Sequence, residues 1–288
     1  MTAIHKMAKA VLPEIAIDIA VALKQYRGVH GVTPNLLFPR TFNEKVVHRS
    51  LFDNRPILRR FADKYAVREY VTEKLGAHIL PELYWVTEAP STMPFGEFPE
   101  KFVVKPTHGA GWVRIVKDKT NFDADDLVKE CHSWLSRNFY HQCRERVYKN
   151  IPPRILVEEF IDDGSEDAPV DYKFLVFHGR VEFITPVYDR FTAPRAYFLD
   201  RNWKVLETGL ALNPQTAMDK TEKDVRPPKH LAELIEAAEI LADGMDFVRA
   251  DFYDTGDRIY FGELTTTPGA GLAKFSPDTF DEYLGSFW

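Results

Sequence analysis

A segment near the C-terminus, FVRADFYDTGDRIYFGELTTTPGAG at residues 247–271, constrains the fold more than any other part of the sequence. Two runs of strand composition flank the turn sequence DTGD, which predicts a β-hairpin. Each run carries one carboxylate among apolar residues, Asp251 in the first and Glu263 in the second. Directly paired residues of a hairpin have Cβ atoms about 5 Å apart. We therefore expect Asp251 and Glu263 to face each other on one side of the hairpin.

Two facing carboxylates repel and raise each other's pKa unless a cation lies between them. Hard carboxylate oxygens suit Mg²⁺, which usually takes one or two carboxylates together with substrate phosphates. The pattern thus favours a divalent-metal site at Asp251 and Glu263. The alternative is a surface hairpin whose acids face solvent, and spacing alone leaves that alternative open because metal-site motifs have false positives.

Charge and cysteine content narrow the classes of protein. The chain has 288 residues, 45% of them hydrophobic, so it can bury a sizeable core. A net charge of −6 argues against a general nucleic-acid binder, which needs a basic surface. Only two cysteines occur, Cys131 and Cys143. Neither a disulfide framework nor a zinc pattern is available, which is typical of a reducing cytoplasm, so we expect a cytoplasmic protein.

No segment has the ~18 uninterrupted apolar residues of a membrane-spanning helix. The nearest, residues 8–23, is interrupted by Lys9, Glu14 and Asp18 and lacks the cleavage site of a signal peptide. Its apolar residues recur at helical spacing, which predicts a helix packed on the body. A weak association of this amphipathic helix with a membrane surface stays open.

Helical signals continue through the first quarter of the chain. A loop is predicted at residues 31–34, and Thr41 with Glu44 forms the capping-box pattern at the start of a helix. Pro56 suits the first turn of a second helix. The sequence YAVREYVTEKLG predicts a third, ended by Gly76. Asp63 and Lys64 precede it and, taken alone, are ordinary surface charges.

After Gly76 the sequence changes to short apolar runs, LPELYWV and KFVVKP, which predict strands. The second run leads into KPTHGAG and then the strand-like VRIVKD. A small-residue loop between two strands can act as a flap whose backbone N–H groups cover phosphates. Lys105 lies in the apolar strand before this loop, and a buried lysine requires a partner. A polyphosphate would meet that requirement.

The remaining chain alternates strands and helices. We predict a helix at residues 123–140, a buried strand at 154–161 and a hairpin that turns at His178 and Gly179. Lys173 lies in an apolar strand of that hairpin, as Lys105 does in its own. A further turn is expected at residues 200–202 and a helix at 231–241.

The order of these motifs resembles a known family. FNEK, DKYAVREYV, FVVKPTHGAGW, ILVEEF, DYKF, VRADFY and YFGELTTTPGAG follow one another between residues 42 and 285. This order is similar to that of the ATP-grasp superfamily, most closely its TupA-like branch, which is associated with genes for teichuronopeptide and other cell-surface polysaccharides. The last motif also resembles that of D-alanine–D-alanine ligases, in which an R-x-D strand precedes E-x-N-T-x-P-G.

The resemblance implies an α+β class with the ATP-grasp fold, in which two α+β subdomains enclose a nucleotide cleft. A short helical N-terminal segment would occupy residues 1–60. The N-terminal subdomain with its glycine-rich flap would occupy residues 61–160, and the C-terminal subdomain with the metal site residues 161–288. ATP is the expected nucleotide, and Mg²⁺ the expected metal, as two ions.

The resemblance also assigns site residues. Lys105 would contact the α-phosphate, Lys64 would reach the phosphates, and Lys173 and Arg249 would be catalytic contacts of the transferred group. Asp251, Glu263 and Thr265 would bind Mg²⁺. The flap and the adenine and ribose contacts would come from His108, Gly109, Ala110, Gly111, Glu158, Glu159, Phe160 and Ile161.

Two departures from the family stand out. Relatives usually carry asparagine two residues after the second acid, where this chain has Thr265, and a threonine hydroxyl reaches less far than an amide carbonyl. Many ATP-grasp enzymes also have a Rossmann-like domain ahead of the grasp, which the mostly helical stretch before Phe61 cannot form. The acceptor side of the cleft is therefore the part that the resemblance transfers least.

The resemblance implies an ATP-dependent carboxylate–amine ligase that forms an amide through an acyl-phosphate. The expected partners are a small carboxylate and a small amine, with neither nucleic acid nor a transmembrane segment, and the sequence does not address oligomeric state. Three alternatives stay open: a kinase or phosphotransferase on the same scaffold, a non-catalytic nucleotide-binding protein, and a glycosyltransferase of polysaccharide biosynthesis.

Overall fold

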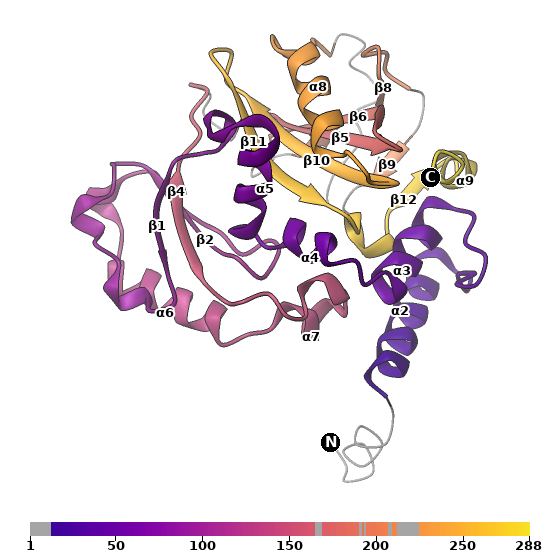
Figure 1. The fold of residues 1–288 in the computed structure, drawn as a ribbon, viewed down its shortest axis with the longest axis horizontal. Coiled ribbons are helices and arrows are strands. Elements are labelled where there is room, and N and C mark those ends of the chain that lie inside the picture. Colours follow the sequence, from indigo (N-terminus) through magenta and orange to yellow (C-terminus); the bar gives the residue numbers. More distant parts are fainter. Residues whose placement is uncertain (1–12, 165–168, 190–191, 193, 207–208, 212–224) are drawn as a thin grey trace.

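Two antiparallel sheets organise the molecule, and each has its own helices (Figure 1). The computed structural model describes residues 13–164, 169–189, 192, 194–206, 209–211 and 225–288. The smaller sheet has the strand order β1-β4-β2-β3 and the larger the order β11-β10-β5-β6-β7, with β8 also paired to β6. A third, two-stranded sheet joins β12 to β9. The expected α+β class is confirmed.

The strands of the smaller sheet are β1 (Leu83–Thr87), β2 (Phe102–Pro106), β3 (Arg114–Val116) and β4 (Ile155–Glu159). Those of the other two sheets are β5 (Asp171–Phe177), β6 (Arg180–Tyr188), β7 (Arg195–Ala196), β8 (Leu199–Asp200), β9 (Gly209–Ala211), β10 (Phe247–Asp254), β11 (Ile259–Thr265) and β12 (Lys274–Ser276). The helices are α2 (Glu14–His30), α3 (Phe42–Phe52), α4 (Pro56–Ala62), α5 (Ala66–Leu75), α6 (Ala124–Leu135), α7 (Phe139–Cys143), α8 (Leu231–Leu241) and α9 (Thr279–Gly285).

The β10–β11 hairpin forms as the sequence predicts. Gly256, with φ of 83°, allows the tight turn between the strands. Asp251 is paired directly with Glu263, so the expected register is confirmed. Ala250, Phe252 and Leu264, on the other face, are buried. A bulge after Asp251 shifts the pairing beyond it.

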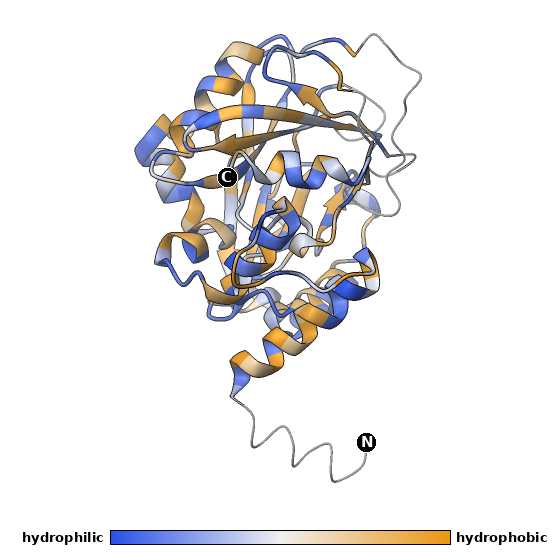
Figure 2. Ribbon diagram, turned by 90° about the vertical axis from the view of Figure 1, so that its right-hand side faces the viewer, coloured by the Kyte–Doolittle hydropathy of each residue, from blue (hydrophilic) through white to orange (hydrophobic). Residues whose placement is uncertain are grey.

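The core of the larger sheet is shared with helices from early in the chain. The cluster joins Phe174 and Phe252 of the sheet to Leu234 of α8 and to Leu58 and Val71 of α4 and α5. Residues of α5 therefore pack on the larger sheet, although they lie in the stretch 61–160 that we assigned by sequence to the N-terminal subdomain. Figure 2 shows the hydrophobic strands and the amphipathic helices that cover them.

A second core lies between the smaller sheet and α6, where Phe102 and Val157 contact Leu127 and Trp134. The single helix predicted at 123–140 is instead two helices. After Leu135, Asn138 takes an extended conformation, with φ of −108° and ψ of 114°, and its side chain caps α7 by accepting from the Tyr140 N–H. The helix α6 therefore ends at Leu135, and Asn138 starts a separate helix, α7.

The N-terminal helix α2 projects away from the two sheets (Figure 1). It runs from Glu14 to His30 and ends at the left-handed Gly31, later than the stretch 8–23 suggested; residues 1–12 lie outside the described part of the chain. Its Asp18 is fully buried, and the Tyr140 hydroxyl donates to the carboxylate, with both carboxylate oxygens 2.8 Å from the hydroxyl oxygen. Arg146 at 3.2 Å and Arg144 at 3.5 Å complete this cluster.

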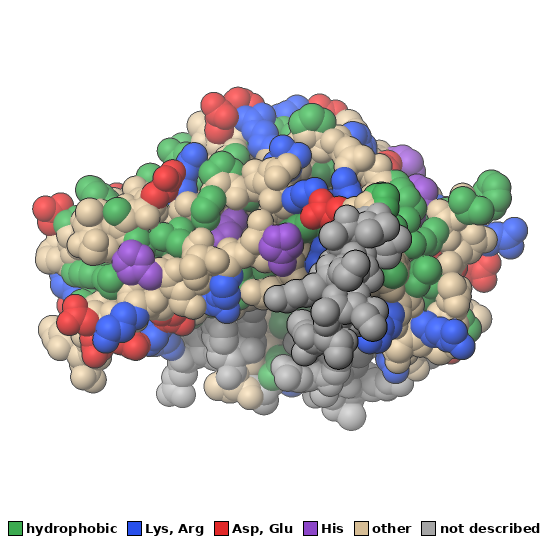
Figure 3. Space-filling model, turned by 90° about the horizontal axis from the view of Figure 1, so that it is seen from below, with side chains coloured by type: hydrophobic (Ala, Val, Ile, Leu, Met, Phe, Trp, Pro, Cys, Tyr) green, Lys and Arg blue, Asp and Glu red, His purple; other side chains and the backbone are tan. Residues whose placement is uncertain are grey.

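The surface carries charges of both signs, scattered over the face seen in Figure 3. None of the helices in the described ranges is both long enough and apolar enough to cross a bilayer. Cys131 and Cys143 are both free, as expected.

Close helix packing gives a stability prediction at Gly285. A Cβ on this residue would lie 2.2 Å from the Arg40 carbonyl oxygen and 2.7 Å from the Phe42 nitrogen, in backbone that cannot yield easily. Gly285→Ala should destabilise the protein by about 1–3 kcal/mol, as overpacking does. Gly28→Ala is the matched control, since its Cβ meets open space in a helix, and should be neutral or stabilising. Urea unfolding measures both, and equal stability of the two variants would contradict the packing.

Candidate active site

A row of polar side chains crosses the larger sheet. Pairing places Thr185 opposite Lys173, Lys173 opposite Asp251 and Asp251 opposite Glu263. Two residues further along the hairpin, and on the same face, Arg249 is paired with Thr265. Because side chains of alternate residues share a face, these groups and Asp171 project on the side away from the hydrophobic core. The structure thus brings together the predicted metal and catalytic residues.

Arg249 and Lys173 compensate the acids of this row. The Arg249 guanidinium donates to Asp251 at 2.7 and 2.6 Å, and also to Glu263 at 2.7 Å. Lys173 donates to Asp251 at 2.7 Å and to Asp171 at 2.6 Å. Asp171 is a functional candidate that we did not single out, although it begins the DYKF motif; its signal was the two-residue spacing to Lys173, which places both on one face.

Burial sets the electrostatics of the row. Asp251 is only 1% exposed, and this burial raises its pKa, against the opposing effect of Arg249 and Lys173. The pKa of Arg249 is raised because the attraction of Asp251 and Glu263 exceeds the cost of its burial. Glu263 differs, since its side chain is 46% exposed. Glu263 is therefore the acid of the pair that a ligand in solution can reach.

The donor atoms fit Mg²⁺ only in company with phosphates. Asp251 and Glu263 offer carboxylate oxygens, and the Thr265 hydroxyl lies 3.0 Å from Glu263 Oε1. Over the described part of the chain, no group of three His, Cys, Asp or Glu side chains is placed to hold a metal alone. Mg²⁺ that keeps water and substrate oxygens needs only one or two carboxylates, which this set supplies.

Opposite the row, lysines from two different elements approach each other. Lys105 of β2 forms an ion pair with Glu158 of β4, which is 6% exposed. Lys64, between α4 and α5, donates to the Gly109 carbonyl, and burial lowers its pKa to about 8. Arg68, one helical turn beyond Lys64, lies 3.7 Å from Glu158. We did not single out Arg68, though its four-residue spacing from Lys64 was a usable signal.

The predicted flap is divided between two roles. Ala110 and Gly111 line the cleft, and Gly111 has φ of 72°. A Cβ on Gly109 would lie 2.8 Å from the Trp112 ring, so a larger residue there would displace that ring. His108 is 3% exposed and points elsewhere, with Nε2 at 3.1 Å from the Trp134 carbonyl oxygen at the end of α6. The structure does not place the His108 side chain on the cleft wall.

Glu159 joins the two sheets at the other end of the cleft. Its carboxylate accepts from the Tyr260 hydroxyl at 2.7 Å and from Arg258 at 3.2 Å, both in the β10–β11 hairpin. Phe160 and Ile161 follow and line the cleft. The side chain of Glu159 is thus committed to a contact within the protein, while the segment after it faces the space between the sheets.

The cleft between the sheets has about 1140 Å³ of empty space, open solvent at its mouth included. It is lined by Lys105 and Glu158 of the smaller sheet, by Asp171, Asp251 and Glu263 of the larger sheet, and by Lys64. A smaller pocket, with about 590 Å³ of empty space when open solvent is included, shares Lys64, Lys105 and Glu263 with the cleft. Its remaining wall includes Tyr148 and residues 264–267.

Comparison with known proteins identifies the arrangement. Residues 44–288 match the family model described as TupA-like ATPgrasp. The chain belongs to the TupA-like ATPgrasp family. This membership confirms the resemblance found in the motifs and accounts for two sheets with a cleft between them. No curated protein sequence matches the chain.

Several solved ligases are similar to parts of this TupA-like ATPgrasp chain. D-alanine–D-alanine ligase from Bacillus anthracis complexed with ATP has 16% identity and a TM-score of 0.42, over 73% of this chain and 54% of that one. L-amino acid ligase from Bacillus licheniformis has 14% identity and a TM-score of 0.46, over 80% and 49%. The ATP-grasp ligase PsnB with its minimal precursor has 14% and 0.39, over 74% and 54%. The chain thus spans about half the length of these ligases.

Lys105 gives a test of the nucleotide side. If Lys105 binds phosphate as the resemblance implies, Lys105→Met should raise the KM for ATP about 10-fold or more, because one charge-assisted contact would be lost. Lys129→Met, on the exposed face of α6, is the control and should leave the KM unchanged. The KM is measured from ADP release at varied Mg²⁺–ATP. An unchanged KM in Lys105→Met would mean that the phosphates bind elsewhere.

Proposed function

We propose that this chain is an ATP-dependent carboxylate–amine ligase. The observation that carries the proposal is the pair of acids Asp251 and Glu263 on the wall of one cleft that Lys64 and Lys105 also line. Arg249 and Lys173 hold Asp251 in place from behind that wall and do not themselves line the cleft. Such a set neutralises phosphate charge and positions reactants, which is what phosphoryl transfer to a carboxylate requires. Membership of the ATP-grasp superfamily supports the same reaction.

In the proposed reaction a carboxylate oxygen attacks the γ-phosphorus of ATP, and the bond from phosphorus to the ADP oxygen breaks. An amine nitrogen then attacks the carbonyl carbon of the acyl-phosphate, the carbon–nitrogen bond forms, and phosphate leaves. Asp251, Glu263 and Thr265 would hold Mg²⁺, which when bound neutralises charge on the phosphates. Lys105 and Lys64 would bind the phosphate chain, while Arg249 and Lys173 would orient Asp251 and contact the transferred group.

For the nucleotide, we propose that Phe160 and Ile161 flank the adenine and that residues 109–111 cover the phosphates. Glu158 supports this site by holding Lys105 in place. For the acceptors, we propose an amino acid or small amine and a uronic acid or similar precursor of a surface polysaccharide. That choice rests on the resemblance to the TupA-like branch. We propose the cytoplasm as the place of the reaction, where ATP is available.

A panel of carboxylates tests the proposal. Purified protein is incubated with Mg²⁺–ATP, hydroxylamine and one carboxylate at a time, including glucuronate, galacturonate and common amino acids. ADP release that depends on the carboxylate, with formation of its hydroxamate, is expected because hydroxylamine intercepts an acyl-phosphate. A stable phosphorylated product in place of the hydroxamate would identify a kinase. ADP release with none of the carboxylates would defeat the ligase.

A further inference from the structure

Glu145 is a carboxylate without a cationic partner within the described residues. The arginines on either side of it, Arg144 and Arg146, both turn toward Asp18 of α2. Glu145 turns the opposite way and accepts a hydrogen bond of 2.5 Å from the Thr267 hydroxyl. Its other neighbour is Cys143, whose sulfur accepts from the Glu145 backbone N–H at 3.4 Å. Glu145 is half-buried, and a carboxylate that loses part of its hydration without gaining a cation costs free energy unless a ligand supplies the charge.

The surroundings of Glu145 connect it to the smaller pocket. Thr267, to which it is bonded, lines that pocket together with Val147 and Tyr148, which lie two and three residues after Glu145 in the chain. Glu263, Lys64 and Lys105 line both this pocket and the nucleotide cleft. The pocket therefore joins the proposed site of the acyl-phosphate to Thr267, and Glu145, which does not itself line the pocket, lies one hydrogen bond beyond that residue.

Among Glu145 and its titratable neighbours, the Glu145 carboxylate is the group whose pKa lets it exchange a proton near neutral pH. Burial raises the pKa of Glu145 to about 7, against the hydrogen bonds from Thr267 and Cys143. Burial raises the pKa of Cys143 to about 12 and that of Tyr148 well above its usual value. The carboxylates of Glu145 and Glu263 both add to the shift of Tyr148, so its phenol lies within reach of both charges and stays neutral.

We propose that Glu145 receives the ammonium group of the amine substrate in the smaller pocket and takes a proton from it. This inference rests on the proposed ligase function. The Glu145 carboxylate accepts one proton from R–NH₃⁺, and the freed nitrogen lone pair attacks the acyl carbon. The carbon–oxygen bond to phosphate breaks, the second N–H proton goes to the leaving phosphate, and Glu145 returns its proton to solvent. The site thus takes a primary amine that is protonated in water.

The test compares two nucleophiles in Glu145→Gln. The glutamine keeps the oxygen that accepts from Thr267 but cannot bind an ammonium ion by charge or take its proton. Hydroxylamine is uncharged at neutral pH and needs no base, so hydroxamate formation and the KM for ATP should stay at the wild-type level. With ammonium chloride, methylamine, glycine or L-alanine, kcat/KM for amide formation should fall about 100-fold or more. In the wild type that kcat/KM should rise with pH to a plateau above about 7. In the variant, which depends on amine already deprotonated in solution, kcat/KM should keep rising above that pH without the plateau.

The outcomes of this test separate the role of Glu145 from the proposed ligase function. Amide formation by Glu145→Gln at the wild-type rate, with the pH profile intact, overturns the role of Glu145 and leaves the ligase proposal standing. If the wild type forms the hydroxamate but forms no amide with any of the amines, the role of Glu145 is also overturned, since a site for an ammonium group should accept at least ammonia. No hydroxamate from the wild type overturns the ligase proposal, and the role of Glu145 with it.

Thermal unfolding gives a readout that needs no substrate. Because burial raises the pKa of Glu145 from 4.5 to about 7, the folded state holds the proton more tightly than the unfolded state. Its effect on wild-type stability therefore becomes unfavourable as pH rises between about 4.5 and 7. The Tm of Glu145→Gln relative to wild type should increase over that range. Glu97→Gln, at an exposed position, is the control and should show no such trend. If the difference in Tm between Glu145→Gln and the wild type does not change with pH, Glu145 is not an acid that lacks a counter-charge in the folded protein.

Discussion

Glu263→Gln is expected to lower kcat by about 10³-fold, the scale for removing one group that stabilises developing charge. The carboxylate is the accessible acid of the row, and its loss removes one negative charge from the proposed metal site. The glutamine oxygen can still accept from Arg249 and Thr265, whose donor atoms lie 2.7 and 3.0 Å from Glu263 Oε1. The fold should therefore remain intact. ADP release measures kcat, and circular dichroism with the Tm checks the fold.

A matched control separates the site from the general effect of removing a charge. Glu233→Gln, on the exposed face of α8, changes the same chemical group far from the row and should leave kcat unchanged. The Mg²⁺ concentration that gives half-maximal activity should rise only in Glu263→Gln. Wild-type turnover in Glu263→Gln would exclude the hairpin acids as the metal site.

Asp18→Ala is expected to lower the free energy of unfolding by about 3 kcal/mol, because it leaves buried partners without their counter-charge. The Asp18 carboxylate is fully buried and holds the Tyr140 hydroxyl and the guanidinium groups of Arg144 and Arg146. All three partners belong to the segment that follows α6. The substitution should therefore loosen the attachment of α2 as well as destabilise the whole protein. Urea unfolding gives the free energy, and limited proteolysis detects the release of α2.

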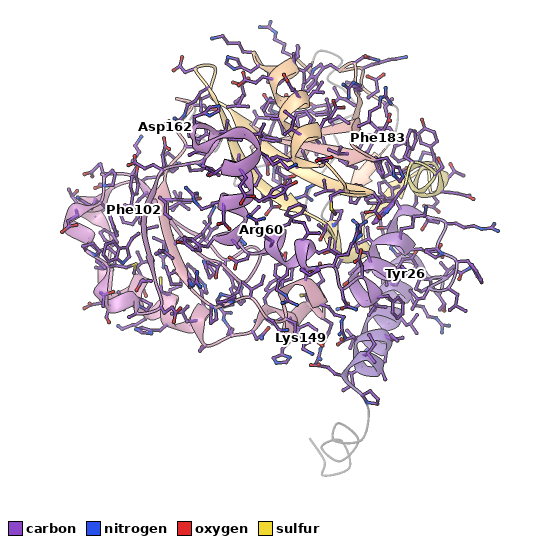
Figure 4. All side chains as sticks on the ribbon, in the orientation of Figure 1. Tyr26, Arg60, Phe102, Lys149, Asp162 and Phe183 are labelled. Atoms are coloured by element: carbon purple, nitrogen blue, oxygen red, sulfur yellow. The ribbon has the colours of Figure 1, made fainter. Side chains whose placement is uncertain are left out.

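The control for Asp18 lies one helical turn away. Glu14 pairs with Lys149, which Figure 4 labels close to α2, but both side chains are partly exposed, at 40% and 32%. Exposed ion pairs contribute little. Glu14→Gln should leave stability near that of the wild type. If Glu14→Gln and Asp18→Ala destabilise equally, burial of Asp18 is not what holds α2.

Local sequence signals predicted much of the fold because the interactions they describe are short in range. The capping box of Thr41 and Glu44 is present as predicted, and α8 begins at Leu231 and ends at Leu241 as its spacing indicated. The facing pair of Asp251 and Glu263 follows from one hairpin turn and a period of two residues. A sequence pattern suffices where the partners lie within about twenty residues of each other.

Longer-range contacts could not be predicted in this way. The partners of Asp18 come from residues 140–146, so the acid resembled an interruption of an apolar helix. His108 belongs to the same motif as the flap glycines, and only the position of α6 determines that it binds the Trp134 carbonyl. Glu145 has no motif around it, and its meaning depends on the opposite directions of its two neighbouring arginines. Each of these required the fold before its role could be inferred.

The two cleft lysines are carried by different bodies of the protein. Lys105 lies in a strand of the smaller sheet, whereas Lys64 lies between two helices whose core is that of the larger sheet. A polyphosphate that binds both lysines would draw the two parts of the protein that carry them together. The affinity for the nucleotide and the closure of the cleft would then depend on each other. By reciprocity, the factor by which ATP binding favours closure is the factor by which closure favours ATP binding. Loss of the Glu159 contacts with Tyr260 and Arg258 should therefore raise the Kd for ATP even though these side chains touch no phosphate.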